Sequence, residues 1–546
     1  MKRILLLCLV LAFTSCKEKP SETETPKSDI SDISTKEFRE FKVEDSKYID
    51  VDQFWKPFEE DMKSFSEDDY IHLKPLFFDQ DMPTIQKNIT SNKLTYEALV
   101  KFYLYRIKKY DRANDKSLNS VISLNPNVIE DARAKDKELK NIDVTPNFNY
   151  SIYGMPILLK DNINTSGMAT TAGAVALKNN YTDDAFIVKQ LKAKGAIILG
   201  KANLSEWAYF FCGDCPSGYS AIGGQTFNPY GRKTIDTGGS SSGSAVAVAA
   251  NFCAAAIGSE TSGSILSPSS QNSAVGLKPT IGLVSRNGII PISSTLDTAG
   301  PITRNVIDNA ILFEAIMSYD AEDSKSIETD WNIIDFEALQ NSNLKGKRFA
   351  TFNRLKKDTL YLNAIKVLRS QGAEIIEIDE EEIDLPDFLR LLNLDMKRDL
   401  PVYFKNYGSQ ELSVATVQDV INFNTKDSLK TAPYGQKLFK GIVADNATEE
   451  EFENIKNTLH KNGKTYFDKA FETHQLDGFL SINNYHAGYA AVAEYPALTV
   501  PMGFEENGVP KGLTFISYPL QEKQLLEWSY AYEQASKARK SPEKYK

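Results

Sequence analysis

Apolar positions recur along the chain first at helical spacing and then as short continuous runs, an alternation typical of an α/β fold. After Thr95, which can cap a helix, the apolar positions fall on one helical face at Leu99, Phe102, Tyr103, Ile107 and Tyr110. The pattern then changes to a short apolar strand over residues 153–160, which ends at Lys160. We therefore expect the motif-bearing, folded part of the chain to begin at about Thr84.

Later segments repeat the alternation of helix and strand. Residues 185–194 predict an amphipathic helix that leads into a strand at 196–199. Further along, a strand, a helix and a second strand follow one another over 348–352, 361–370 and 374–378. Gly372 can end that helix. This order again indicates an α/β domain.

The last third of the chain is helical and charged before it returns to strands. Residues 385–470 carry no chemical motif, and strands are expected at 495–503 and 512–516. Of the 546 residues, 42% are hydrophobic, so a large core can form. The net charge of −10 gives no basic surface of the kind that binds nucleic acid.

The N-terminus has the composition of an export signal. A basic start precedes an apolar run over residues 4–13 that is too short to span a membrane, and Ser15-Cys16 follows. This ending resembles a bacterial lipoprotein signal, which implies cleavage after a signal peptide over 1–15 and lipidation of Cys16. We expect a disordered tether over 16–50 and an exported chain, held by its lipid on the periplasmic or outer-membrane face. The alternative is an ordinary signal cleaved nearby, with Cys16 as a free thiol.

Two Gly/Ser loops within residues 238–269 bracket a run of small apolar residues. The run has no charge from 245 to 257, so we expect it to be buried, as a helix from about Ser244 and then a strand ending near Ile257. Glycine-rich loops can turn backbone N–H groups toward one anion, and a serine hydroxyl beside them suits acyl transfer. A flexible linker would not contain a buried Ala/Val segment, and the Walker and GxGxxG patterns of phosphate loops are absent.

These loops resemble the signature of the amidase signature family, in the segments 238–244 and 258–265 followed by Pro268. The family's second loop usually reads Gly-Thr-Asp-Thr-Gly-Gly-Ser-Ile-Arg, whereas this chain has Glu260, Ser262 and Leu266 at the Asp, one Gly and the Arg. Those departures resemble the branch of bacterial peptide amidases. Three further blocks resemble the family in the same order, at 154–161, 201–206 and 495–501.

The resemblance implies a fold and a set of site residues. The fold would be α/β, a single large domain over 51–546 with a mixed central β-sheet covered by helices. Its motif core would span 84–517, and a variable region at about 385–470 would cover the cleft. Lys160 matches the catalytic lysine, Ser240 the bridging serine on a cis peptide bond, and Ser264 the nucleophile. The oxyanion hole would be formed by backbone N–H groups: Thr261, Ser262, Gly263 and Ser264.

A lysine serves as a base only if its pKa is lowered. A shift from 10.4 to about 7.4 corresponds to roughly 4 kcal/mol, which burial at the end of an apolar strand can provide. Lys160 could then take a proton from Ser240, which takes one from Ser264. One alternative is a surface lysine. Another is a Ser-His-Asp triad assembled from one of the four histidines, none of which lies near the loops in sequence.

Five cysteines have separate expected roles. Cys8 belongs to the signal, Cys16 takes the lipid and Cys253 should be inert core. Cys212 and Cys215 lack the second ligand pair that zinc requires, so no metal is expected, and an exported setting makes a local disulfide possible. We expect this pair to be structural rather than catalytic.

The resulting hypothesis is an amidase without a cofactor that releases ammonia from the C-terminal amide of a peptide. Fatty or aryl amides are alternative substrates within the family. A non-catalytic, lipid-anchored binding protein on an amidase scaffold is an alternative of another class. The amidase subunit of a tRNA-dependent amidotransferase is a further one, which the export signal disfavours.

Overall fold

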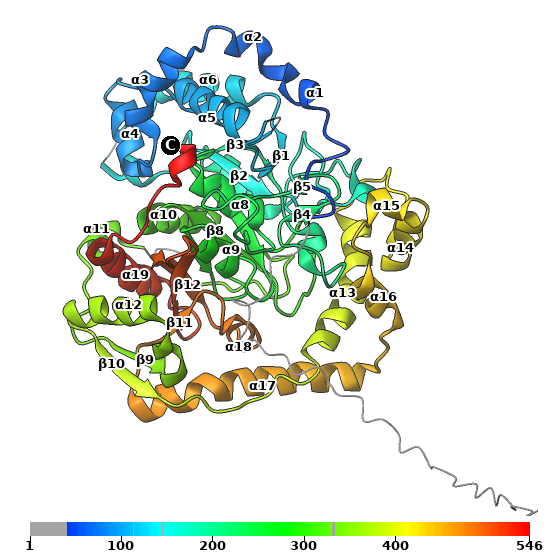
Figure 1. The fold of residues 1–546 in the computed structure, drawn as a ribbon, viewed down its shortest axis with the longest axis vertical. Helices are drawn as coiled ribbons and strands as arrows, with labels where there is room; N and C mark the ends of the chain where they lie inside the picture. Colours follow the sequence, from blue (N-terminus) through cyan, green and yellow to red (C-terminus); the bar gives the residue numbers. More distant parts are fainter. Residues whose placement is uncertain (1–40, 113, 145, 330–333) are drawn as a thin grey trace, which may run out of the picture. The chain divides into compact units, whose positions relative to one another are not determined.

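The computed structural model describes residues 41–112, 114–144, 146–329 and 334–546 (Figure 1). The expected signal peptide, the lipid site Cys16 and most of the tether lie outside the described residues. Contacts group Phe38–Lys546 into one unit. Within the part of the chain that is described, no helix is long and apolar enough to cross a membrane.

An 11-stranded mixed sheet lies at the centre of this unit. In spatial order its strands are β1 (Val121–Leu124), β3 (Ile197–Ala202), β2 (Pro156–Lys160), β6 (Ala255–Glu260), β8 (Thr298–Thr303), β7 (Val275–Lys278), β12 (Ala497–Phe504), β13 (Pro510–Ile516), β11 (Gly478–Ile482), β9 (Arg348–Phe352) and β10 (Glu374–Ile378). Strand β2 runs parallel to both β3 and β6, and β9 runs parallel to both β10 and β11. The other pairs are antiparallel. Strands β4 (Tyr219–Ser220) and β5 (Gly224–Gln225) form a separate small sheet.

Helices cover the sheet (Figure 1). The α-helices are α1 (Val51–Trp55), α2 (Glu59–Met62), α3 (Glu67–Phe77), α4 (Met82–Thr90), α5 (Tyr96–Tyr110), α6 (Val128–Leu139), α7 (Phe186–Ala193), α8 (Ser242–Ala249), α9 (Leu266–Gln271), α10 (Val306–Ile316), α11 (Phe336–Gln340), α12 (Thr359–Ser370), α13 (Phe388–Asn406), α14 (Val417–Thr425), α15 (Ser428–Thr431), α16 (Lys437–Ala444), α17 (Glu449–His474), α18 (Ala487–Val492) and α19 (Glu522–Ser536). Short 3₁₀ turns lie at Lys56–Phe58, Pro146–Tyr150, Val175–Leu177, Glu206–Tyr209, Asn353–Lys357 and Glu543–Tyr545. This arrangement confirms the expected fold class, a mixed central sheet with covering helices.

The helix expected after Thr95 is α5. The Thr95 hydroxyl oxygen accepts a hydrogen bond from the Ala98 N–H and caps its first turn, as the sequence pattern predicts. The apolar positions named above are all buried against the core. Burial of that face stabilises the helix, because an isolated helix of this length is marginal in water.

The Gly/Ser segment forms α8 and then β6. Every residue of both elements is buried, which confirms the inference drawn from the lack of charge. Strand β6 continues to Glu260, three residues beyond the end expected from sequence. It continues because β8 pairs with it as far as Glu260, whereas its pairing with β2 ends at Ile257. The second Gly/Ser loop therefore begins where a central strand ends.

The region from 385 to 470 is helical, as expected, and comprises α13 to α17. Its buried apolar residues, among them Leu394, Leu400, Phe439 and Leu459, join residues such as Trp207 and Phe211 in a hydrophobic cluster separate from the main core. Helices α13, α14 and α16 pack on one another and lie together in Figure 1. The charged faces predicted from the sequence lie outward on this layer, where residues such as Lys430 and Glu449 are exposed.

Candidate active site

Strand pairing in the sheet brings the second Gly/Ser loop close to Lys160. Lys160 is the last residue of β2, and β6, which leads into the loop, runs parallel beside it. Parallel neighbours end at the same edge of a sheet, so Lys160 and the residues that close β6 come together there. The Lys160 side chain has no exposed surface, which rules out a surface lysine at the end of a strand.

Three oxygen atoms surround the Lys160 ammonium nitrogen. Lys160 Nζ lies 2.8 Å from Ser240 Oγ, 3.0 Å from the Ser259 carbonyl oxygen and 2.9 Å from Ser259 Oγ. The Gly239–Ser240 peptide bond is cis, in agreement with the resemblance. The sequence signature thus led to one of the two residues in contact with the lysine, Ser240. It did not lead to the other, Ser259.

Burial lowers the pKa of Lys160 to about 7, although the carboxylates of Asp297 and Glu260 act in the opposite direction. A neutral lysine has two N–H groups and one lone pair. The two N–H groups can be donated to the Ser259 carbonyl oxygen and Oγ, which leaves the lone pair for the Ser240 hydroxyl. Ser259 is in turn held by Asn162, whose side-chain N–H donates to Ser259 Oγ over 2.9 Å.

Ser264 lies in the loop between β6 and α9. Its carbonyl oxygen accepts a hydrogen bond of 3.1 Å from the Ser241 N–H, which ties the two Gly/Ser loops together. The residue is partly exposed, and no described residue hydrogen-bonds its hydroxyl. The structure therefore joins Lys160 to Ser240 directly, whereas no described hydrogen bond links the hydroxyls of Ser240 and Ser264. Hydrogen bonds of this kind are often long without substrate.

The Glu260 carboxylate organises the loop that carries Ser264. Its Oε1 accepts the N–H of Gly263 over 2.7 Å, and its Oε2 accepts the N–H groups of Ile265 and Leu266 over 2.7 and 3.0 Å. One expected oxyanion donor is therefore engaged, since the Gly263 N–H already binds Glu260. The N–H groups of the other three have no acceptor among the described residues: Thr261, Ser262 and Ser264.

Gly263 itself is required by the loop geometry. Its φ of 93° lies in the left-handed region. A Cβ there would also lie 2.9 Å from Asn484 Nδ2.

A second buried lysine stands behind the site. Lys201 lies on β3, and its Nζ is 3.4 Å from Oδ1 of Asp161, the residue that follows Lys160 in the lysine motif. Burial lowers the pKa of Lys201 to about 8, against the attraction of Asp161. The Lys201 ammonium also donates to the carbonyl of Ile163 and to the Thr170 hydroxyl. Lys201 and Asp161 therefore hold the segment that follows β2. Neither side chain makes a described hydrogen bond to the serines of the Gly/Ser loops.

The histidine alternative has no support in the structure. No hydrogen bond within the described part of the chain joins Ser264 to any of the four histidines: His72, His460, His474 and His486. Only His486 contacts a serine hydroxyl, with its Nδ1 2.5 Å from Ser481 Oγ. Burial and the Arg354 guanidinium lower the pKa of His486 to about 3. Ser481 is itself buried within β11, so this pair is part of the packing.

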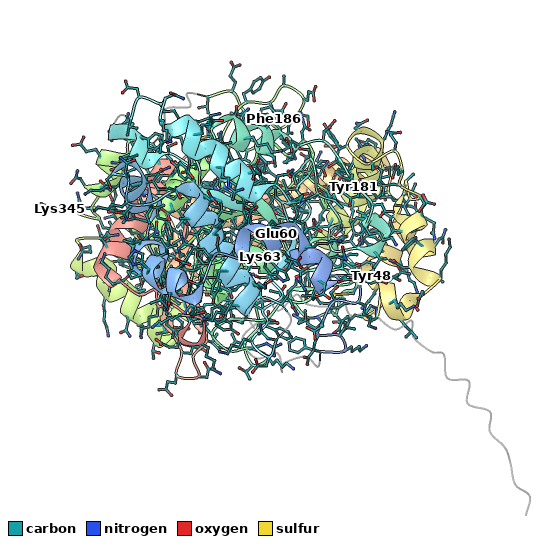
Figure 2. All side chains as sticks on the ribbon, turned by 90° about the horizontal axis from the view of Figure 1, so that it is seen from above. Tyr48, Glu60, Lys63, Tyr181, Phe186 and Lys345 are labelled. Atoms are coloured by element: carbon teal, nitrogen blue, oxygen red, sulfur yellow. A yellow bond between two sulfur atoms is a disulfide. The ribbon has the colours of Figure 1, made fainter. Side chains whose placement is uncertain are left out.

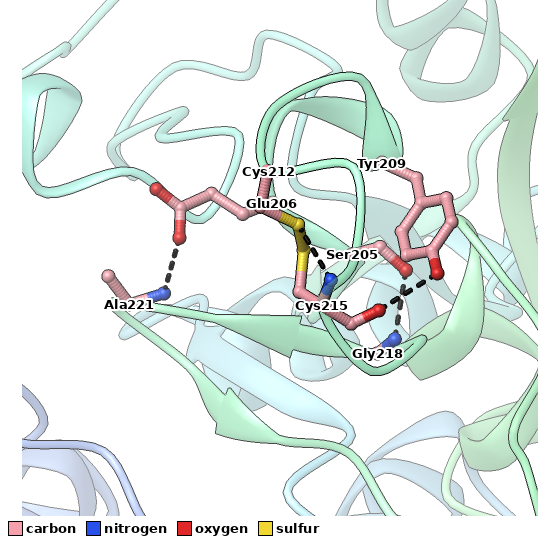
Figure 3. Close-up of a disulfide and its surroundings, with 7 residues drawn as sticks. All are labelled: Ser205, Glu206, Tyr209, Cys212, Cys215, Gly218 and Ala221. Carbon is pink, nitrogen blue, oxygen red and sulfur yellow. Dashed lines mark hydrogen bonds between the residues drawn. A yellow bond between two sulfur atoms is a disulfide. The ribbon is translucent and has the colours of Figure 1, made fainter. Parts of the chain in front are cut away.

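Cys212 and Cys215 form a disulfide, with Cα atoms 5.9 Å apart (Figure 3). The Tyr209 hydroxyl donates to the Cys215 carbonyl oxygen over 2.8 Å and braces the same loop. Cys253 is free and buried, and burial raises the pKa of its thiol to about 12, as expected for inert core.

The block 201–206 connects the disulfide loop to the serine loop. Ser205 Oγ accepts the Gly218 N–H over 2.8 Å (Figure 3). The Ser205 N–H donates to the Ser240 carbonyl oxygen over 3.0 Å. Glu206 is buried beside it and accepts the Ala221 N–H over 2.9 Å. Burial raises the pKa of Glu206 well above its usual range. Ser205 therefore links the Ser240 backbone to Gly218, in the segment that follows the disulfide.

Two cavities lie beside the chain that leaves β2, one lined in part by Asn164 and the other by Asp161. One has a volume of about 710 Å³ and is lined in part by Phe186, and the other has about 470 Å³ and is lined in part by Tyr48. Tyr181 lines both, and Figure 2 labels all three aromatic residues. Neither cavity is lined by Lys160 or Ser264. Among the described residues, no group of His, Cys, Asp and Glu is suited to hold a metal ion.

Comparison with known proteins gives consistent matches. The family model described as Amidase matches residues 98–526. A protein of Arabidopsis thaliana described as a probable amidase is 36% identical over 475 residues, which cover 84% of this chain and 90% of that protein. A glutamyl-tRNA(Gln) amidotransferase subunit of Staphylococcus aureus is 30% identical over 458 residues, covering 77% of this chain and 90% of that protein. The X-ray structure of native peptide amidase from Stenotrophomonas maltophilia matches with a TM-score of 0.79 and 37% identity, over 85% of this chain and 99% of that chain.

These matches agree with the motifs. The family model spans both Gly/Ser loops and the lysine motif, and the solved structure shares the fold over nearly its whole length. The chain therefore belongs to the amidase signature family and is a hydrolase that acts on amides.

Proposed function

We propose that this amidase cleaves a carboxamide through an acyl-enzyme, with Ser264 as nucleophile, Ser240 as proton relay and Lys160 as base. Ser264 Oγ attacks the amide carbon, its proton passes to Ser240 Oγ, and the Ser240 proton passes to Lys160 Nζ. Collapse of the tetrahedral intermediate breaks the C–N bond, and the proton returns through Ser240 to the leaving nitrogen. Water then attacks the ester by the same relay and releases the acid.

The observation that carries this proposal is the fully buried contact between Lys160 and Ser240. Because burial lowers the pKa of Lys160 to about 7, a large fraction of the lysine is neutral at physiological pH. The two acceptors on Ser259 direct its lone pair toward Ser240 rather than to solvent.

The negative charge that develops on the substrate oxygen in the transition state must be stabilised by hydrogen-bond donors. The N–H groups of Thr261, Ser262 and Ser264 supply up to three of them, because Glu260 takes the Gly263 N–H but leaves these free. One such donor typically accounts for about 2.7–4 kcal/mol of transition-state stabilisation. Their position beside the partly exposed Ser264 suits a tetrahedral intermediate.

The substrate that we propose is the C-terminal amide of a peptide, with ammonia as the leaving group. Two observations support this choice. The peptide amidase of Stenotrophomonas maltophilia is 37% identical over 85% of this chain, and the departures at Glu260, Ser262 and Leu266 resemble that branch. Fatty and aryl amides remain the alternatives to test, as does a role like that of the amidotransferase relative.

Ammonia release across four substrate classes tests the proposal: peptide amides, fatty amides, aryl amides and free glutamine. We expect the highest kcat/KM on peptide amides, with internal peptide bonds left intact, and no release by Ser264→Ala. Faster turnover of fatty or aryl amides would contradict the substrate and leave the chemistry in place. If no amide is hydrolysed and a fluorophosphonate does not label the protein, the binding-protein alternative is correct.

We further propose that the protein is exported and anchored to a membrane by a lipid on Cys16. This proposal is supported by sequence alone, through the basic start, the short apolar run and the Ser15-Cys16 ending. A tether of over 20 polar and charged residues would then separate the lipid from the amidase domain.

A further inference from the structure

Asp297 reaches the oxyanion loop from a neighbouring strand. Strands β6 and β8 pair antiparallel with Glu260 opposite Thr298, so the residue after β6 and the residue before β8 face each other. These are Thr261 and Asp297, and the Thr261 hydroxyl donates to Asp297 Oδ1 over 2.5 Å. The contact is made by two side chains that no signature motif joins.

Both oxygens of the Asp297 carboxylate are occupied. Oδ1 binds the Thr261 hydroxyl, and Oδ2 accepts the N–H groups of Ile292 and Ser293 over 2.8 and 2.9 Å. Burial raises the pKa of this carboxyl, whereas the hydrogen bonds from Thr261, Ser293 and Ile292 and the nearby Arg286 guanidinium act in the opposite direction. With its acceptor positions filled by the protein, Asp297 is placed to hold the loop rather than to bind substrate.

The support behind Asp297 extends to helix α13. Ser293 Oγ donates to Asp395 Oδ2 over 2.5 Å, and the Ser294 N–H donates to Asp399 Oδ2 over 2.6 Å. Asp395 and Asp399 lie on α13, part of the layer that the sequence predicts over the cleft. The segment that carries Asp297 is thus fixed on one side by α13 and contacts the oxyanion loop on the other.

Two carboxylates therefore hold the oxyanion loop at different points. Glu260 binds the N–H groups of Gly263, Ile265 and Leu266, at and beyond the middle of the loop. Thr261, at the start of the loop, makes no hydrogen bond to Glu260, and its hydroxyl binds Asp297 instead. We propose that Asp297 is a positioning residue for catalysis, which acts through the Thr261 hydroxyl to aim the Thr261 N–H at the substrate oxygen. This inference rests on the proposed function, in which that N–H is an oxyanion donor.

The charge of Asp297 also affects the pH dependence of activity, which gives a second measurement. The charged groups that interact with it are Lys160 at the end of β2, Arg286 in the preceding loop and Asp399 on α13. Glu260 on β6 acts on the same Lys160, and Asp395 acts on the same Asp399. A negative Asp297 favours the protonated form of Lys160. Removing the charge should therefore move the rising limb of the pH profile to lower pH. Removing only the Thr261 hydroxyl should leave that limb where it is.

Thr261→Val and Thr261→Ser form a matched pair for the test, because valine keeps the shape of threonine and serine keeps its hydroxyl. With a peptide amide as substrate, we expect kcat of Thr261→Val to fall roughly 10- to 100-fold, less than the 10²–10³-fold loss of a whole donor. KM should change less than about threefold, because the donor acts mainly in the transition state. Thr261→Ser should recover most of kcat.

Equal kcat in Thr261→Val and wild type would overturn the inference, as would a Thr261→Ser variant that is as slow as Thr261→Val. If Thr261→Val does not fold, as judged by circular dichroism, Asp297→Asn carries the test. It should lower kcat and move the limb to lower pH, and an unchanged kcat in the folded variant would contradict the inference. Absence of amide hydrolysis by the wild-type protein would instead contradict the proposed function.

Discussion

Lys160 Nζ and Ser240 Oγ lie 2.8 Å apart, and neither side chain has any exposed surface. Water cannot hydrate the lysine ammonium in this position, so the charged form is disfavoured. In the mechanism that we propose, burial thereby lets Lys160 act as a base near neutral pH.

The first prediction concerns pH. For a peptide amide, kcat/KM should rise with pH through one ionisation at about pH 7, because burial lowers the pKa of Lys160 to about 7 and only the neutral form accepts a proton. In Lys160→Ala the limb should vanish, together with most of the activity. A profile of the same shape in that variant would assign the ionisation to another group.

A second prediction concerns Ser259, whose hydroxyl contacts Lys160 Nζ over 2.9 Å beside the Ser240 hydroxyl. Ser259→Ala removes an acceptor of a charged donor, an interaction of about 1.5–3 kcal/mol, so kcat/KM should fall by about 10-fold or more. Since the protonated lysine loses more than the neutral one, the rising limb should move to lower pH. Ser259→Thr retains the hydroxyl and is the control. Equal activity and an unmoved limb in Ser259→Ala would show that Ser259 does not orient the base.

Sequence reasoning pointed to Lys160, Ser240 and Ser264 because each lies in a local run of residues whose order carries information. Ser259 lies within the same run, but its role depends on the parallel pairing of β2 with β6, which no local pattern specifies. Asp297 lies outside that run, and only the antiparallel pairing of β6 with β8 brings it to Thr261. An isolated Asp or Ser has many structural roles, so neither residue could be selected without the register.

The fold shows the same limit. The local periods gave α5, β9 and β10 nearly to the residue. The end of β6, by contrast, was misplaced because pairing with β8 extends the strand to Glu260, beyond its pairing with β2, which ends at Ile257. Sequence also did not show that the Gly263 N–H, expected as an oxyanion donor, is bound by the side chain of Glu260 at the end of β6.

A third prediction concerns the disulfide. Replacing Cys212 and Cys215 together by serine should lower the free energy of unfolding by about 2 kcal/mol, the chain-entropy value for so short a loop. The melting temperature should fall by a few degrees, whereas kcat should change less than about threefold because the pair lies outside the contacts of Lys160. Thermal melting and steady-state kinetics of the same preparation measure both. A large loss of kcat in the folded double variant would make the pair part of the catalytic machinery.

A fourth prediction concerns the N-terminus. If Cys16 carries the lipid, the wild-type protein should enter the detergent phase of a two-phase separation, and Cys16→Ser should remain aqueous or unprocessed. Mass spectrometry of the N-terminal peptide should show the acyl groups. Wild-type protein in the aqueous phase with an unmodified N-terminal residue would contradict the proposed anchor.

The most direct test of the central claim is to react the protein with a fluorophosphonate and locate the adduct by mass spectrometry. Attack by the activated serine on phosphorus expels fluoride and leaves a stable ester on the nucleophile. We predict one adduct, on Ser264, which is lost in Ser264→Ala. Labelling should be slow in Ser240→Ala and Lys160→Ala, because each change breaks the proton path. An adduct on any other residue, or labelling that survives Ser264→Ala, would contradict the assignment.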